Sequence, residues 1–173
     1  IEATLNALAA AVVEATQSVA CAVALIDDER RFYRIAGAFG LPEGYGAAVE
    51  DAYRAGANIS SLEAHRTRRP IRRTRTDYMR RDPRQTRASA LVRDAGWDAI
   101  VSVPLVFRNR ALGAMTCCYP IGLEPDEQEI AFLLVIADQA AVAVETAQLF
   151  ADAQGKAALE ERQKLARELH DSV

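Results

Sequence analysis

Residues 97–120 read WDAIVSVPLVFRNRALGAMTCCYP, and this stretch decides the fold. Its two apolar halves, 97–107 and 111–119, flank the turn Arg108-Asn109-Arg110. Such segments predict an antiparallel hairpin, because parallel strands need a crossover of about a dozen residues or more.

A second hairpin is predicted upstream. Residues 19–26 read VACAVALI, a nearly continuous apolar run typical of a strand buried on both faces. Residues 31–39 follow the charged turn 27–30 and form its predicted partner. We further expect an edge strand at 71–76.

Helices are expected between and around these strands. Helical spacing or helix-ending residues place them at 1–17, 45–54, 60–65 and 86–95. Ser60 or Ser61 is expected to cap the third of these helices, Pro70 to end it, and Gly96 to end the fourth. The last helix is expected to begin at Pro125, with acidic residues in its first turn.

The order of elements indicates the fold class. It runs helix, two strands, helices, edge strand, helix, two strands and a long helix, with hairpins too short for parallel crossovers. We therefore predict an α+β fold (an α/β sandwich): a mostly antiparallel sheet flanked by helices, with a long C-terminal helix. Beyond Pro125 only Gly155 interrupts the helical pattern, either as a hinge or as a tolerated surface residue.

Size and composition fit one domain with an extension. The chain has 173 residues, half of them hydrophobic, and a net charge of -3. No run of apolar residues is long enough to predict a membrane segment in this stretch. Three cysteines suit neither a zinc site nor a disulfide framework, so we expect no metal and a reducing, cytoplasmic setting. The missing initial methionine leads us to expect a piece of a longer protein.

The last residues, 160–173, read EERQKLARELHDSV. Apolar residues at Leu165, Ala166, Leu169 and Val173 recur at helical spacing and form a narrow seam. His170 lies at the flank of that seam, about 100° from Leu169. A half-exposed histidine beside a carboxylate, here Asp171, is well placed to exchange a proton or a phosphoryl group.

This ending resembles the phosphoacceptor (dimerisation) helix of bacterial two-component sensor histidine kinases of the nitrate and cell-envelope-stress sensor type. The matching residues are Arg162, Leu165, Ala166, Arg167, Glu168, Leu169, His170 and Asp171. Residues 97–150 resemble the second half of a GAF domain, a sensory module. The matching marks are Val103-Pro104-Leu105, Leu112-Gly113 and Asp138-Gln139-Ala140-Ala141. The resemblance implies a GAF sensor domain at 1–150 and a signalling helix with a truncated phosphoacceptor helix at 151–173.

The resemblance implies a signal-input region that couples a small-molecule or redox signal to phosphorylation. His170 would accept phosphate from ATP, Asp171 would act as the adjacent acid or base, and a response regulator would receive the phosphate. ATP and Mg belong to the ATP-binding domain of a full-length kinase, so this fragment alone is expected to be inactive. A parallel homodimer is also implied. The alternative is a ligand-free GAF dimerisation module in a kinase that senses elsewhere.

Position in the fold suggests the walls of a ligand pocket. The candidates are Phe39, Tyr45, Tyr53, His65, Tyr78, Met79, Trp97, Ser102 and Met115. Haem-binding GAF relatives use a histidine near the position of His65. Arg66, Arg68 and Arg69 follow it closely here, so a surface histidine is favoured over a haem ligand.

Cysteines and arginines complete the candidates. Cys117 and Cys118 are consecutive in a strand and face opposite sides, while Cys21 lies on a neighbouring strand. We expect these cysteines to be buried and to act as small hydrophobic residues; a redox sensor and a methionine-sulfoxide reductase are the less favoured alternatives.

Eleven arginines fall between residues 66 and 93. Self-pairing or solvation is favoured over an anion-binding wall. Direct nucleic-acid binding is not expected, because Tyr78 is the only aromatic residue there.

Overall fold

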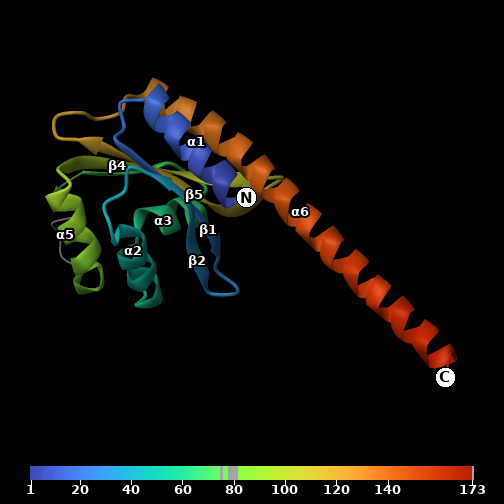
Figure 1. The fold of residues 1–173 in the computed structure, drawn as a ribbon. Coiled ribbons are helices and arrows are strands. Elements are labelled where there is room, and N and C mark those ends of the chain that lie inside the picture. The colour runs from blue at the N-terminus through green and yellow to red at the C-terminus, as the bar shows by residue number, and fades with distance from the viewer. Residues whose placement is uncertain (75, 78–81, 173) are drawn as a thin grey trace.

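The sheet carries helices on both faces (Figure 1). The computed structural model describes residues 1–74, 76–77 and 82–172. Its strands are β1 (Ala20–Asp27), β2 (Phe32–Phe39), β3 (Ile71–Thr74), β4 (Trp97–Phe107) and β5 (Arg110–Pro120). They pair antiparallel in the order β2-β1-β5-β4-β3, which confirms the predicted fold class.

Two helices cover one face of the sheet. They are α1 (Glu2–Ala15) and α6 (Glu127–Asp171), which lie along each other in Figure 1. Leu5, Ala9 and Val12 of α1 share one buried core with Leu133 and Val144 of α6.

In the described part of the chain, three shorter helices cover the other face. They are α2 (Tyr45–Arg54), α3 (Ser60–Thr67) and α5 (Thr86–Asp94), preceded by the 3-10 turn η1 (Pro83–Gln85). Their apolar residues pack with Ala24, Ile100 and Cys118 of the sheet in a second core. Because side chains alternate along a strand, β4 places Ile100 in this core and Val101 in the first.

The local predictions for the two hairpins need small corrections. The β4–β5 turn is shorter than expected: Arg108 and Asn109 alone have positive φ, 43° and 65°, and Arg110 already pairs with Phe107. Two positive φ values match the twist of adjacent antiparallel strands. In the other hairpin, Ala36 has no partner on β1, which makes a bulge.

Three predictions of where a helix begins or ends were also wrong in detail. Ile59, not a serine, is the N-cap residue of α3, because Ser60 and Ser61 direct their hydroxyls into the protein. That helix continues to Thr67 and ends at Arg68 in a left-handed conformation, two residues before Pro70. Pro125 lies just outside α6; Asp126 is its N-cap and accepts from the backbone N–H of Glu129 at 2.8 Å.

Candidate functional site

A small chamber lies between the sheet and α2, α3 and α5. Its volume is about 40 Å³, which leaves room for a few water molecules at most. Most of the lining is apolar and comes from both layers: Ala22, Ala24, Tyr33, Ile35, Leu41, Tyr45, Val49, Ile59, Ser60, Ser61, Gln85, Ala88, Ser89, Val92, Thr116 and Cys118.

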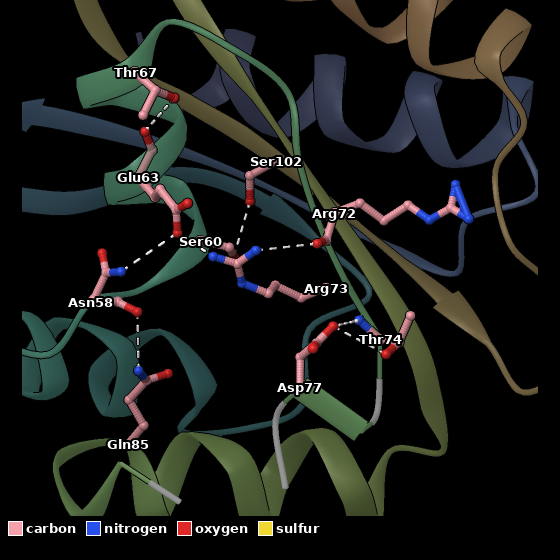
Figure 2. A network of polar contacts seen from close by, with 10 residues as sticks. All are labelled: Asn58, Ser60, Glu63, Thr67, Arg72, Arg73, Thr74, Asp77, Gln85 and Ser102. Carbon is pink, nitrogen blue, oxygen red and sulfur yellow. Dashed lines mark hydrogen bonds and ion pairs between the residues drawn. The ribbon is translucent and has the colours of Figure 1, made fainter. Parts of the chain in front are cut away.

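A larger polar cavity adjoins this chamber (Figure 2). Its volume is about 240 Å³, and it is lined by Asn58, Ser60, Arg73, Asp77, Asp82, Gln85 and Ser89. Three of these residues, Ser60, Gln85 and Ser89, also line the chamber. The two spaces therefore form a polar entrance beside an apolar interior, an arrangement that many small-molecule sites share.

Hydroxyl groups provide most of the polarity near the chamber. Ser102 donates to the Ser60 hydroxyl at 3.1 Å and lies 2.8 Å from the Thr116 hydroxyl. The Tyr33 hydroxyl lies 2.8 Å from that of Ser61, and burial raises the pKa of Tyr33. Tyr33 therefore remains a neutral hydrogen-bonding group and not a base.

Charged side chains around the polar cavity have hydrogen-bond partners in the surrounding protein. Arg73 donates to Glu63 of α3 and to the backbone carbonyl of Arg72. Asp77 accepts from the backbone N–H and the hydroxyl of Thr74, at 2.8 and 3.1 Å. Figure 2 shows Glu63 of α3 pointing toward Arg73 of β3, and Asp77, which follows that strand in the chain, pointing toward Thr74. The cavity thus offers hydrogen bonds without a strong net charge.

Few of the predicted pocket residues line these spaces. Tyr45 does, and Trp97 packs edge-on against it at 5.3 Å between ring centroids. Ser102 contributes through Ser60, and Tyr53 stacks on Tyr33 at 5.1 Å.

The remaining candidates lie elsewhere. Phe39 is 49% exposed at the end of β2, outside both linings. Met115 belongs to the core under α1 and α6, since its strand position points to that face. Tyr78 and Met79 lie outside the described residues. Sequence reasoning missed Tyr33, Ser61, Gln85 and Ser89, although strand alternation would have placed Tyr33 on the face of Ala24.

His65 is buried, which corrects the expectation of a surface histidine. Only 8% of it is exposed, its Nδ1 has no partner in the described structure, and the ring is hydrogen-bonded to the backbone of Gly113. Burial lowers the pKa of His65 below its ordinary value of 6.5, so the imidazole is neutral near pH 7. It lines neither cavity.

The arginines of the cluster are largely paired, as expected. Arg66 binds Asp28 through two hydrogen bonds of 2.7 and 3.1 Å, and this contact lowers the pKa of Asp28. Other described arginines pair with nearby oxygens: Arg68 with Asn109, Arg72 with Glu124, Arg84 with Asp82, and Arg87 with Asp51. Each of these exposed contacts adds little stability, but each places an oxygen next to a described arginine.

The three cysteines are buried thiols. Cys21 and Cys117 face each other across β1 and β5 with their sulfurs 3.8 Å apart, and Cys118 lies on the other face. The hydrogen bond to Cys21 and burial raise the pKa of Cys117, and burial raises that of Cys118. Both groups therefore lack the thiolate character of reactive cysteines.

Helix α6 joins the sheet to the histidine near the C-terminus. It runs unbroken from Glu127 to Asp171, and it extends far beyond the sheet in Figure 1. Its last buried residue is Val144, and residues 148–172 are all exposed. His170 and Asp171 are therefore both open to solvent.

The outer face of α6 carries a mostly apolar row of side chains in which Gln139 and Thr146 are polar. We call Phe132, Val135, Gln139, Val142, Thr146, Leu149 and Ala153 the proximal seam; all are exposed. They repeat at alternating steps of three and four residues, the spacing of a coiled coil. Apolarity on two faces explains why an 18-residue window of α6 reaches a mean hydropathy of 1.8, enough by length and composition to cross a membrane. A third of that window is buried in the protein.

Comparison with known proteins identifies the fold. A domain assigned to a two-component sensor histidine kinase from Sinorhizobium meliloti 1021 superposes with a TM-score of 0.65 and 22% identity, covering 84% of this chain and 91% of that one. The GAF domain/HD domain protein from Geobacter sulfurreducens gives 0.63 and 22%, covering 86% and 94%. The blue-light absorbing form of the Thermosynechococcus elongatus PixJ GAF domain gives 0.64 and 17%, covering 90% of each chain.

The family follows from the sequence itself. No curated protein matches the chain significantly. The GAF domain profile, however, matches residues 1–145, which include the whole sheet and the buried part of α6. This chain therefore belongs to the GAF domain family.

Proposed function

We propose that this chain is the signal-input region of a two-component sensor histidine kinase. One observation carries the proposal: the helix that covers the GAF sheet is the same helix that presents His170. No linker separates the two, so a movement of α6 on the sheet displaces the histidine directly. In this proposal residues 1–150 form the sensor and 151–173 the signalling helix with the start of the phosphoacceptor helix.

The cavities supply the input side. A small molecule at the polar cavity would contact α3, β3 and the loop before α5, and would reach the sheet through Ser60 and Ser102. Strand β4 then connects the two faces, since Ile100 packs under the cavity helices and Val101 under α6. This is a contiguous packed route from ligand to helix.

Two copies of the chain form the working unit. Residues 148–172 are exposed along their whole length, whereas helices in proteins gain most of their stability from packing. The proximal seam also leaves apolar side chains exposed. Parallel pairing of two α6 helices along this seam supports the exposed helix segment and covers the apolar side chains. It also brings the two His170 residues side by side.

His170 is the proposed nucleophile. A neutral imidazole nitrogen attacks the terminal phosphoryl group of ATP, a phosphorus–nitrogen bond forms, and ADP leaves. Asp171 would orient the ring or hold its other proton. ATP and Mg are supplied by an ATP-binding domain of the full-length kinase, and a response regulator in the cytoplasm takes the phosphoryl group.

One observation favours the alternative of a ligand-free dimerisation module. The apolar chamber, at about 40 Å³, is too small for an organic ligand unless the surrounding helices move. Native mass spectrometry of the purified chain separates the two functions. A dimer with added mass supports the sensor, and a bare dimer that gains no mass from a metabolite extract supports the module.

The phosphoacceptor role can be tested without a kinase domain. Phosphoramidate donates a phosphoryl group to histidine, with ammonia as the leaving group. We expect phosphohistidine at His170 and its transfer to a receiver domain, whereas His170→Gln should abolish both. Buried His65 is the internal control. Labelling without any transfer would contradict the proposed role.

A further inference from the structure

The end of the β4–β5 hairpin contacts helices on both faces of the sheet. We call its residues 107–110 the tip. On the face of the cavities, Nη1 of Arg68, at the C-terminal end of α3, donates to Oδ1 of Asn109 at 2.6 Å. On the opposite face, Arg110 donates to Glu145 of α6. The tip therefore joins two helices that pack on opposite faces of the sheet (Figure 1).

The contact with α6 lies at the point where that helix leaves the sheet. Glu145 directly follows Val144, the last buried residue of α6. The side chain of Glu145 is only 15% exposed, although it carries a charge. A partly buried ion pair is screened less by salt than an exposed one. The bond from Arg110 therefore holds α6 at the last position that the domain supports.

The backbone of this connection takes a conformation that its residues rarely adopt. Arg68, Arg108 and Asn109 have positive φ values of 55°, 43° and 65°. Among the described residues, Arg31 is the only other non-glycine residue with a positive φ. Glycine or asparagine is usual both at such a helix end and in such a turn. Local backbone preference therefore does not explain the two arginines, whereas their side-chain contacts do.

The tip is fixed to the sheet and to α3. Phe107 pairs with Arg110 in the ladder and packs against the core under α1 and α6. The guanidinium of Arg108 lies over the Phe107 ring, 5.4 Å from its centroid. Helix α3 is also bonded to β5 a few residues along the strand, through the ring of His65 and the backbone of Gly113. A shift of α3 therefore moves the tip with it.

We infer that the tip is a mechanical link between α3 and α6, so that the position of α3 sets how firmly α6 is held where it leaves the sheet. The link itself needs neither a ligand nor a phosphoryl group. Its use in signalling rests on the proposed function: Ser60 and Ser61 of α3 line the chamber, and an occupant that moves α3 acts on α6 through the tip. This route passes around the end of the hairpin and is separate from the packing through β4.

Three variants break the link at one end, at the other, and at both. Arg68→Met keeps the length of the side chain and the backbone preference of a non-glycine residue, but loses the donor to Asn109. Glu145→Gln keeps the shape of the side chain and removes its charge. The third variant combines the two changes. The matched control is Arg87→Met on α5, which removes an exposed arginine paired with Asp51 on the cavity side, away from the tip.

The readout is amide hydrogen exchange of residues 145–149 in α6. Rates are compared with those of β1 in the same sample, because core amides report global unfolding and α6 then reports local opening. We expect Glu145→Gln to speed exchange at 145–149 several-fold, and Arg68→Met to do so from the opposite face. The double variant should be no faster than Glu145→Gln alone, since the remote change acts through that pair. Arg87→Met should match the native chain.

Three results would overturn the link. They are native exchange at 145–149 in Arg68→Met, native exchange there in Glu145→Gln, and a double variant in which the two effects multiply. Sedimentation checks that every variant keeps the oligomeric state of the native chain. None of these results depends on His170, so the link and the phosphoacceptor role succeed or fail separately.

Discussion

Single buried groups decide much of the chemistry of this domain, and His65 is the clearest case. Its ring is enclosed by α3 and the sheet, with Asp28 and Arg66 nearby, and Nδ1 is unpartnered among the described residues. Sequence reasoning placed it on the surface because three arginines surround it in the chain. In the fold Arg66 instead turns to Asp28 and leaves the imidazole inside.

This burial predicts a pH dependence of stability. The folded pKa of His65 is lowered from 6.5, so the unfolded chain binds the proton more strongly and stability falls as the pH drops below 6.5. Asp28 loses its own contribution only below pH 3.8, since its pKa is lowered. The thermal unfolding temperature of the native chain should therefore fall more on acidification to pH 5 than that of the His65→Leu variant. Parallel curves for the two proteins would show that His65 does not titrate in this way.

Gly37 is required by the packing of α1 on β2. A Cβ at this position would lie 2.6 Å from the backbone carbonyl carbon of Leu5, which is closer than real atoms approach. We expect Gly37→Ala to cost about 1–3 kcal/mol of unfolding free energy, as other overpacked sites do. Denaturant unfolding measures the loss.

The matched control is Gly46→Ala in α2. There the nearest atom, Cδ1 of Ile35, would be an ordinary 3.6 Å from the new Cβ. This change should be neutral or stabilise by about 0.5–1 kcal/mol. Equal losses at the two glycines would mean that α1 does not press on β2 as described.

At the scale of elements, β2 is an edge strand, and two of its N–H groups are hydrogen-bonded to side chains of the flanking helices. Asn6 of α1 accepts from the N–H of Ala38 at 2.8 Å, and Glu50 of α2 accepts from that of Ile35 at 3.1 Å. Together with the bulge at Ala36, these contacts leave little of the edge free for another strand.

Removing one of the side chains that bond to the edge of β2 should promote association through this strand. We expect Asn6→Ala to lose about 1 kcal/mol of stability and to aggregate faster on warming. Light scattering during a thermal ramp follows the aggregation. Glu14→Ala, an exposed change on the same helix, should behave like the native chain. If both variants scatter alike, the edge is protected by other means.

Strands and helices were largely predictable because each has a clear local pattern. The apolar run in β1, the β4–β5 hairpin and α2 fall where the sequence indicates. The N-cap of α3 was not predictable, since the hydroxyls of Ser60 and Ser61 can bond either to the helix end or to side chains on the strands. Tertiary contacts with Ser102 and Tyr33 prevail over the local bond. The residues that line the cavities were hard to predict for the same reason, because the lining depends on which strands lie side by side.

For the whole molecule, the dimer proposed above depends on the exposed seam of α6. Val142 is 46% exposed on that seam. Val142→Glu should therefore produce a monomer by sedimentation while the unfolding temperature of the sheet domain changes little. Gln148→Glu adds the same charge away from the seam and should remain dimeric. A dimeric Val142→Glu variant would move the interface to another surface.

The contact between Tyr45 and Trp97 has a practical consequence. Trp97 is the single tryptophan of the chain, it is buried, and the ring that it touches is a wall of the chamber. Any occupant that displaces Tyr45 alters the surroundings of the only indole, and with them the colour and lifetime of its fluorescence. The domain thus contains its own optical probe, and a metabolite collection can be screened against it in a cuvette without a label.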